Sequence, residues 1–480
     1  MQFNSFSYLA ILGIVVAIFW TLPKGNPRRW FVLALSILFY GSWSWKYAPI
    51  PVVICAISYV CARAIVRNPS RARAAVWTGA ILVLFILGFF KYRNFFVDNL
   101  NQLLQLYGHS PVQAAFAFGF PLGISFYSFE AISYLIDTRQ GRVKNVRIID
   151  LFTFVMFWPH LIAGPIVRVR ELVPQLAFQK PFERAMLLKG LDRLIWGLVQ
   201  KNLIANNIGS WVDEGFLPQS SRANTTLDNW VLAFAFGLQI YFDFSSYSDM
   251  AIGAAQLIGI TLPENFRFPY HAKNPSDFWT RWHMTLSRWI RDYLFFPINA
   301  KYQNNPAALY TSLIGIMALV GLWHGAGWGF VIWGVMHGCY LVLYRISERC
   351  TENRPQLAQS PWFLGAWRVF TLFAVMAAWI PFRASSAGQA THMLRTMVIP
   401  GSLRPSYSIN FYLITLLVAL IALIEPYVTE RFHKLDGFFN RSGSRMLLNL
   451  LAWRPLVYAF GLLLFIIFDD QNTQFIYFQF

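Results

Sequence analysis

The chain has 480 residues, of which 56% are hydrophobic and only 13% are charged. Soluble domains carry about 25% charged residues, so this composition excludes an ordinary soluble protein and indicates a chain embedded in lipid. The formal net charge of +18 is therefore interpreted as the basic excess of cytoplasmic loops, and no nucleic-acid partner is predicted.

Apolar runs recur from end to end, and a helix needs about 20 such residues to cross the bilayer. The predicted spans are 5–22, 30–45, 49–66, 74–90, 116–136, 149–166, 230–260 with polar interruptions, 308–323, 327–344, 362–381, 407–427 and 455–468. Some are short or broken. We therefore expect an all-α polytopic membrane protein with about ten to twelve transmembrane or re-entrant helices, forming one domain over residues 1–480.

Basic residues cluster in alternate links between the first four spans. They are Lys24, Arg28 and Arg29 in the first link, and Arg63, Arg67, Arg71 and Arg73 in the third. The second link carries only Lys46, and the acidic stretch at 469–471 suits the opposite side. The positive-inside rule then places the two basic links in the cytoplasm and the N-terminus outside. We expect residues 5–22 to be the first span and not a cleaved signal peptide, because MQFNSFSY lacks positive charge and no small-residue cleavage site follows.

Two polar interruptions fall inside apolar runs, where polar groups are costly and indicate function. At 158–168, two prolines and a glycine break the predicted helix beside His160. At 241–250, a polar group predicts a re-entrant turn or a cavity wall. Its members are Asp243, Ser245, Tyr247 and Asp249.

The segment 278–294 predicts an amphipathic helix in the membrane interface, at the cytoplasmic surface. At 100° per residue the polar stripe consists of Asp277, Arg281, Arg288, Arg291 and Asp292. The opposite face consists of Trp279, Trp282, Leu286, Trp289, Ile290 and Tyr293. His283 projects onto this apolar face, as a packed histidine or as a functional one.

A glycine-rich run surrounds His324 between two apolar helices, at 321–329. Glycines this dense interrupt a helix or allow a ligand or another backbone to come close. Close helix packing explains the glycines but leaves an ionisable ring at membrane depth unexplained, so a functional role is favoured. His337 would face away from His324 if one continuous helix carried both residues. A role in packing or in supporting the site is therefore at least as good an interpretation of His337 as a catalytic role.

The four cysteines have no CxxC spacing, and the chain lacks Walker A, GxGxxG and GxSxG motifs. Neither a metal site nor a bound cofactor is therefore predicted.

These residues resemble the membrane-bound O-acyltransferase family. The runs that carry the resemblance are IYFDFSSYSDMAIG at 240–253, FRFPYHAKNPSDFWTRWHMTLSRWIRDYLFFP at 266–297 and GLWHGAGWGFVIWGVMHG at 321–338. MFWPHLIAGPIVR at 156–168 and FIYFQF at 475–480 are similar to its bacterial alginate O-acetyltransferase branch. The likeness is loosest before about residue 115, which implies N-terminal helices at 1–115, a core with the catalytic motifs at 116–345 and C-terminal helices at 346–480.

The resemblance implies a helical ring around a tunnel, open to a cytoplasmic acyl donor and to an acceptor outside. His324 matches the family's catalytic histidine, and His283 matches the polar residue that faces it across the tunnel. Residues expected to support the site or line the tunnel are His337, His160, Asp243, Ser245, Tyr247, Asp249, Trp323 and Trp282. The branch also implies the bacterial inner membrane and a separate extracytoplasmic polysaccharide O-acetyltransferase as partner.

Moving an acetyl group from a thioester to a hydroxyl needs a base near neutral pH, and histidine is that side chain. We expect His324 to be the general base, with His283 orienting the thioester or polarising its carbonyl. Direct transfer is preferred, and an acyl-histidine intermediate stays open. The donor is expected to be acetyl-CoA or an acyl carrier thioester. Its phosphates would contact three arginines, for which anionic lipid is an equal partner: Arg281, Arg288 and Arg291.

Two alternatives stay open. One is D-alanyl transfer to teichoic acid by a related branch, with a carrier protein as donor. The other is a transporter without covalent chemistry, which broken helices also suit, although no inverted repeat is visible.

Overall fold

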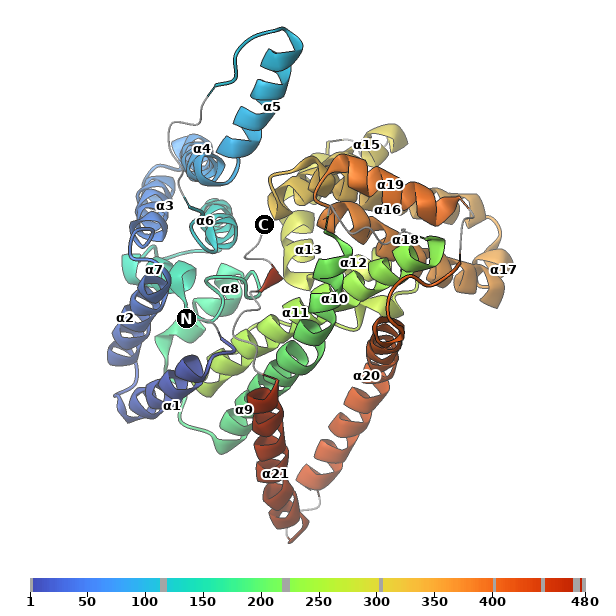
Figure 1. The fold of residues 1–480 in the computed structure, drawn as a ribbon. Coiled ribbons are helices and arrows are strands. Elements are labelled where there is room, and N and C mark those ends of the chain that lie inside the picture. Colours follow the sequence, from blue (N-terminus) through green and yellow to red (C-terminus); the bar gives the residue numbers. More distant parts are fainter. Residues whose placement is uncertain are drawn as a thin grey trace. The chain divides into compact units, whose positions relative to one another are not determined.

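The computed structural model describes residues 3–112, 119–217, 225–301, 305–399, 403–441, 445–468 and 475–476, and of residues 432–454 only the backbone. The acidic stretch 469–471 and the start of the predicted span 116–136 lie outside these residues. The described residues form helices and no strand, which confirms the predicted all-α class (Figure 1).

The chain packs as two compact units, each described here by itself. Unit 1 comprises Met1–Leu194 and Ser248–Pro263, and unit 2 comprises Ile195–Tyr247 and Glu264–Phe480. Two helices, α9 (Arg184–Val199) and α11 (Thr226–Leu257), run from one unit into the other. The prediction of one domain over the whole chain stays a prediction.

Apart from its parts of α9 and α11, unit 1 is built from the helices between Phe6 and Ala177. They are α1 (Phe6–Thr21), α2 (Asn26–Trp43), α3 (Pro49–Arg67), η1 (Pro69–Arg71), α4 (Ala72–Lys91), α5 (Arg93–Leu106), α6 (Ile124–Arg139), α7 (Ile148–Met156), α8 (Val169–Leu172) and η2 (Gln175–Ala177). Helices α3, α4 and α6 pack side by side (Figure 1). A Cβ on Gly79 of α4 would lie 2.5 Å from Cδ1 of Leu135 in α6, so this glycine permits the close approach.

Unit 2 contains the helices that carry most of the predicted site. They are η3 (Gln200–Ala205), α10 (Asn206–Gly215), η4 (Pro269–His271), α12 (Pro275–Trp279), α13 (Met284–Ile290), η5 (Arg291–Phe295), α14 (Phe296–Asn299), α15 (Pro306–His324), α16 (Trp328–Thr351), α17 (Pro355–Ala358), α18 (Pro361–Arg383), α19 (Ala387–Val398), α20 (Ile409–Arg441) and α21 (Arg445–Ile467). Helices α15 and α18 begin with a proline in the first turn, where its missing N–H loses no hydrogen bond. Asn305 and Ser360 cap them through their side chains.

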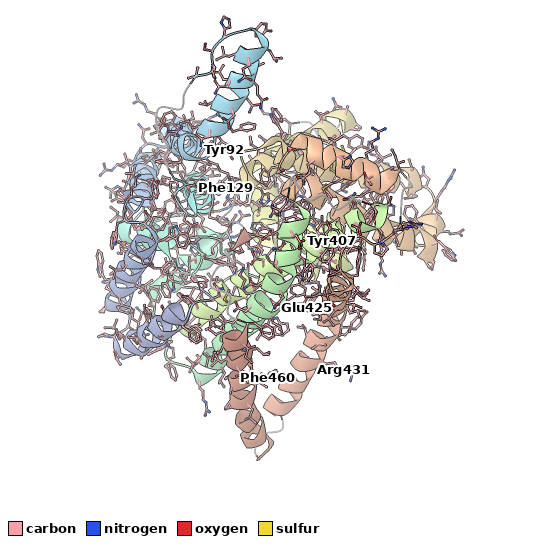
Figure 2. The ribbon with its side chains drawn as sticks, viewed as in Figure 1. Tyr92, Phe129, Tyr407, Glu425, Arg431 and Phe460 are labelled. Carbon is pink, nitrogen blue, oxygen red and sulfur yellow. The ribbon has the colours of Figure 1, made fainter. Side chains whose placement is uncertain are left out.

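Six helices of the described residues are long and apolar enough to cross a membrane. They are Pro49–Arg67, Pro69–Lys91, Pro306–His324, Trp328–Thr351, Pro361–Arg383 and Ile409–Arg431, with Phe6–Thr21 and Pro455–Ile467 as shorter apolar helices. Large apolar side chains on them point outward, such as Phe460 of α21, labelled in Figure 2, which is 60% exposed. A face of this kind requires lipid around it, so the chain is a multi-pass membrane protein. The total of ten to twelve embedded helices stays a prediction.

Three local expectations were wrong. The run 149–166 is not one span, because α7 ends at Met156 and an irregular segment follows, although the break itself was expected. The polar run 241–250 is not a re-entrant turn, because it lies within the unbroken helix α11, and the alternative of a cavity wall stays a prediction. The segment 278–294 is not one helix, because the chain breaks between α12 and α13, with His283 at a φ of 41°.

Two of the basic residues used to predict the topology are internal partners. Arg28 and Arg29 are 5% and 6% exposed. Arg28 donates from Nε to the carbonyl of Leu22 at 3.0 Å, and Arg29 pairs with Asp150 at 3.1 Å. Their charge is therefore used within unit 1, and the outside placement of the N-terminus stays a prediction.

Candidate active site

A tight helical hairpin in unit 2 places His324 at the end of α15. Residues 325–327 separate this helix from α16, so the glycines do interrupt the helix. A Cβ on Gly321 would lie 2.0 Å from the carbonyl oxygen of Phe330, and one on Gly334 would lie 2.1 Å from that of Met317. Only glycine fits at these two positions. The glycine-rich run therefore does both things expected of it: it interrupts the helix and lets α15 and α16 pack closely.

The hairpin brings His324 and His337 to the same indole ring. The centroid of Trp333 lies 5.1 Å from that of His324 and 4.8 Å from that of His337. His337 also stacks on Phe278 at 5.7 Å. On one continuous helix the two histidines would have faced opposite ways. The chain reverses direction at 325–327 instead, so both rings contact the same tryptophan.

His283 is held by contacts that also explain its left-handed backbone. It is fully buried, and its Nδ1 lies 3.0 Å from Oδ1 of Asn265. The same oxygen accepts from the hydroxyl of Thr285 at 2.8 Å, and the carbonyl of Asn265 accepts from the amide of Met284 at 2.8 Å. These bonds hold the chain where α12 has ended and α13 begins, and they offset the cost of a positive φ in a residue with a Cβ.

The hydrogen bonds to Asn265 identify which nitrogen of His283 carries the proton. Oδ1 also accepts from the backbone amide of Thr285 at 3.4 Å, and a backbone amide only donates. Nδ1 of His283 is therefore the N–H donor, and Nε2 carries the lone pair of a neutral ring. Burial lowers the pKa of His283 to about 3, which keeps the ring neutral at physiological pH.

His283 and His324 share one aromatic environment. Their ring centroids lie 6.4 Å apart, and Trp323 lies 6.2 Å from the first and 5.0 Å from the second. Phe244 contacts His283 edge-on at 4.7 Å, and Phe382 contacts His324 at 5.6 Å. We call His283, His324 and His337 with these rings the histidine cluster. A buried imidazole here is able to take a proton from a hydroxyl group in surroundings from which rings exclude water.

Two predicted tryptophans belong to this cluster or flank it. Trp323 is 5% exposed and lies between the two histidines. Trp282 is fully buried, stacks on Phe278 at 5.7 Å and contacts Trp379 at 5.0 Å. Trp323 therefore belongs to the cluster, and Trp282 flanks it through Phe278, which stacks on His337.

Two of the predicted polar residues of α11 have separate partners in unit 2, whereas the buried hydroxyl of Ser245 has no hydrogen-bond partner among the described residues. Asp243 pairs with Lys201 inside unit 2 and accepts from the amide of Ile476 at 2.8 Å. Ser245 is buried, and Tyr247 stacks on Phe475 at 4.6 Å. Asp243 and Tyr247 therefore tie α11 to its neighbours in unit 2.

Asp249 and His160 are placed in unit 1. Asp249 pairs with Arg193 at 2.6 Å, and Nδ1 of His160 lies 3.0 Å from Oε1 of Glu130 in α6. His160 and Glu130 are both about 1% exposed, and the pair anchors the irregular segment after α7 to α6. A structural function therefore accounts for the burial of both.

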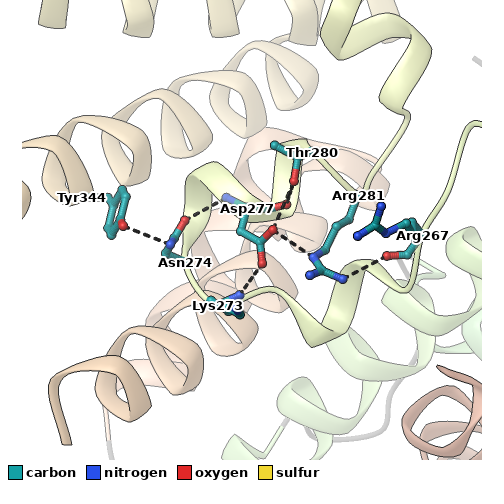
Figure 3. A network of polar contacts seen from close by, with 7 residues as sticks. All are labelled: Arg267, Lys273, Asn274, Asp277, Thr280, Arg281 and Tyr344. Carbon is teal, nitrogen blue, oxygen red and sulfur yellow. Dashed lines mark hydrogen bonds and ion pairs between the residues drawn. The ribbon is translucent and has the colours of Figure 1, made fainter. Parts of the chain in front are cut away.

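The three arginines predicted to contact the donor have intramolecular partners. Nε of Arg281 donates to Asp277 at 3.0 Å and its Nη1 to the carbonyl of Arg267 at 3.4 Å (Figure 3). Arg288 donates to the carbonyl of Met284 at 3.4 Å, and Arg291 pairs with Asp292 at 2.9 Å. Their contact with a donor or with lipid stays a prediction.

Asp277 organises the network in Figure 3. Burial would raise its pKa, but hydrogen bonds from the amide of Lys273 and from Arg281, with the charge of Arg281, hold the pKa below its usual value. Its own amide donates to Asn274, whose Nδ2 donates to the hydroxyl of Tyr344 at 3.0 Å. The network fixes α12 against α16.

The residues that sequence reasoning missed are partners of the predicted ones. Asn265 lies outside any apolar run, so nothing in the sequence distinguishes it. Lys201 and Glu130 are charged residues in apolar surroundings, and that signal was available. Among the described residues no group of three His, Cys, Asp or Glu side chains is arranged to hold a metal ion.

Comparison with known proteins decides the family. The family model of the membrane-bound O-acyltransferases matches residues 5–386. This chain belongs to the membrane-bound O-acyltransferase family. It is 34% identical over 443 residues to the probable alginate O-acetylase AlgI of Azotobacter vinelandii, which covers 90% of this chain and 86% of that protein.

Two relatives act on other polymers according to their names. The peptidoglycan O-acetyltransferase of Helicobacter pylori is 34% identical over 405 residues, covering 78% of this chain and 74% of that protein. The teichoic acid D-alanyltransferase of Bacillus subtilis is 31% identical over 252 residues, covering 50% and 63%. The predicted alginate O-acetylase-like membership is thus confirmed, and the chain is a membrane acyltransferase.

Proposed function

We propose that this protein takes an acetyl group from a cytoplasmic thioester, acetyl-CoA or an acylated carrier, and passes it across the membrane for O-acetylation of an exported polysaccharide. The observation that carries the proposal is the pair of buried imidazoles of His283 and His324, 6.4 Å apart within aromatic walls. Membership of an acyltransferase family leaves no support for a transporter without covalent chemistry.

In the proposed reaction His324 acts as the general base. It removes the proton from the acceptor hydroxyl as the oxygen attacks the thioester carbonyl carbon. The C–O bond forms and the C–S bond breaks, and the proton passes from the imidazolium to the departing thiolate. Protons and charge balance, so no further reactant is needed. General base catalysis of this kind contributes about 10²–10⁴ in rate.

His283 receives the orienting role and not the polarising one. A neutral ring with its proton on Nδ1 offers a lone pair at Nε2, and a lone pair cannot donate a hydrogen bond to a carbonyl oxygen. Nε2 is suited to accept an N–H from the amide-containing arm of a thioester donor. The contact between Nδ1 and Asn265 fixes the ring plane for that purpose.

The names of the relatives support acetyl transfer to a polysaccharide. AlgI proteins are named for alginate, and the Helicobacter pylori protein for peptidoglycan. Alginate or another exported polysaccharide is the proposed acceptor, with a separate extracytoplasmic O-acetyltransferase as partner. D-alanyl transfer to teichoic acid is the second candidate, because the Bacillus subtilis relative matches half of the chain.

The proposal is tested in cells that depend on this protein for polymer acetylation. Replacing His324 by Ala should abolish O-acetyl groups on the exported polymer. Replacing His392, an exposed histidine of α19, by Ala is the matched control and should leave them unchanged. Normal acetylation by a correctly inserted His324→Ala protein would refute the proposed base, and D-alanyl ester in place of acetyl would favour the second candidate.

A further inference from the structure

A cavity of about 300 Å³ lies in unit 2, outside the histidine cluster, where the residues that precede α12 meet α16, α17 and α18. Its lining includes Lys273, Asn274, Tyr344, Glu352 and Trp367. Its size is at the lower end of small-ligand pockets. Figure 3 shows two of the lining residues, Asn274 and Tyr344, joined by a hydrogen bond.

Two oppositely charged side chains of the cavity lining form no ion pair within the described part of the chain. The Lys273 ammonium and the Glu352 carboxylate make no ion pair or side-chain hydrogen bond within the described part of the chain, either with each other or with another group. The neighbouring Glu348 is engaged with Arg345 at 3.1 Å. A lining with one available cation and one available anion is complementary to a ligand that carries both charges.

The cavity lies at the ends of two helices that are apolar enough to span the membrane. It takes residues from the last turns of α16 and the first turns of α18, including Phe363 and Trp367. Trp362 beside it is 89% exposed, as expected of an aromatic ring at the lipid–water boundary. Basic residues cluster at these helix ends and indicate the cytoplasmic leaflet: Arg345, Arg349, Arg354 and Arg368.

We propose that this cavity binds the headgroup of a zwitterionic membrane phospholipid with a primary amine, of the phosphatidylethanolamine class. The ammonium group donates to Glu352, the phosphate accepts from Lys273, and the acyl chains leave the cavity along Phe363 and Trp367. A primary ammonium has three N–H donors for a carboxylate, and the quaternary ammonium of a choline lipid has none. The inference is independent of the acetyl-transfer proposal.

The charges argue against the acyl donor as the occupant. Two carboxylates, Glu348 and Glu352, face the cavity and oppose a group with several phosphates. An occupied headgroup site would instead steady α12, which begins at Pro275. That helix carries Phe278 and Trp279, whose rings contact His337 at 5.7 and 5.2 Å.

The test uses the full-length protein in nanodiscs of equal parts phosphatidylethanolamine, phosphatidylcholine and phosphatidylglycerol. Lipids that stay bound are counted by native mass spectrometry. The variants are Glu352→Gln and Lys273→Gln, and the matched controls are Glu183→Gln and Lys301→Gln, two exposed charges outside the cavity. Thermal melting in phosphatidylcholine verifies that all of them are folded.

Wild-type protein should retain phosphatidylethanolamine about fivefold over each other lipid, the upper end of what one exposed ion pair contributes. Glu352→Gln should remove that preference. Lys273→Gln should lower the retention of all three lipids, because each carries a phosphate, and the controls should change neither quantity. Equal retention of phosphatidylglycerol would overturn the proposal, as would an unchanged preference in Glu352→Gln or unchanged lipid retention in Lys273→Gln. Full competition by soluble glycerophosphoethanolamine without lipid retention would also overturn it, because the site would then take a free headgroup.

Discussion

Replacing Asn265 by Ala tests whether the hydrogen bond to His283 positions the candidate active site. The substitution removes the acceptor of Nδ1 at 3.0 Å and of the Thr285 hydroxyl at 2.8 Å. Both donors are buried, and an unsatisfied buried donor costs about 1–3 kcal/mol. A loss of about 2–4 kcal/mol in the free energy of unfolding is expected, because neighbouring losses are not fully additive.

The expected loss of activity is larger than this instability alone explains. Without its acceptor the His283 ring loses the hydrogen bond that fixes its plane, and a misplacement of about 1 Å in a catalytic group lowers the rate about 10²-fold. The assay measures kcat and KM for acetyl transfer by purified protein in nanodiscs, at a temperature where melting shows the variant folded. Asn68→Ala, at an exposed asparagine, is the control. A kcat for Asn265→Ala within twofold of wild type would refute the positioning argument.

Three further predictions concern stability. Gly334→Ala should lower the melting temperature by an amount equivalent to about 1–3 kcal/mol, because the added Cβ would lie 2.1 Å from a carbonyl oxygen. Gly315→Ala is the control and should melt like wild type, because a Cβ there meets nothing within 4 Å. Equal melting of the two variants would contradict the packing of the hairpin. Because burial depresses the pKa of His283, the unfolded chain binds one more proton than the folded chain at mildly acidic pH. The melting temperature should therefore fall as pH drops from about 6.5 towards 4, and it should fall less steeply in His283→Gln. The same dependence of melting temperature on pH in both proteins would count against a buried neutral ring. Lys201→Met leaves the Asp243 carboxylate buried without its cation and should lower the free energy of unfolding by about 3–5 kcal/mol. Adding Asp243→Asn should restore much of that loss. Additive losses in the double variant would exclude the ion pair.

Composition and periodicity were sufficient to predict the membrane class and the long apolar helices. The prolines that open α15 and α18 and the glycines after His324 are local signals, and the structure places helix ends at them. The break before His283 carries no such signal, because no glycine or proline lies between α12 and α13. It depends on Asn265, whose contribution arises only when distant parts of the chain pack together.

The polar run of α11 was misjudged for a related reason. Asp and Ser side chains in an apolar stretch suggested a turn, but a buried helix tolerates them when they have partners. Asp243 has such partners in Lys201 and the Ile476 amide. The sequence identified the unusual residues correctly, whereas the pairing that allows a continuous helix comes from tertiary structure.

The proposed acyl transfer depends on His324 acting as the base. The most direct measurement is single-turnover transfer of a labelled acetyl group from thioester to acceptor by the purified protein in nanodiscs. Relative to wild type and to His392→Ala, His324→Ala should be at least about 100-fold slower at unchanged melting temperature. Transfer at the wild-type rate by a folded His324→Ala protein would contradict the account.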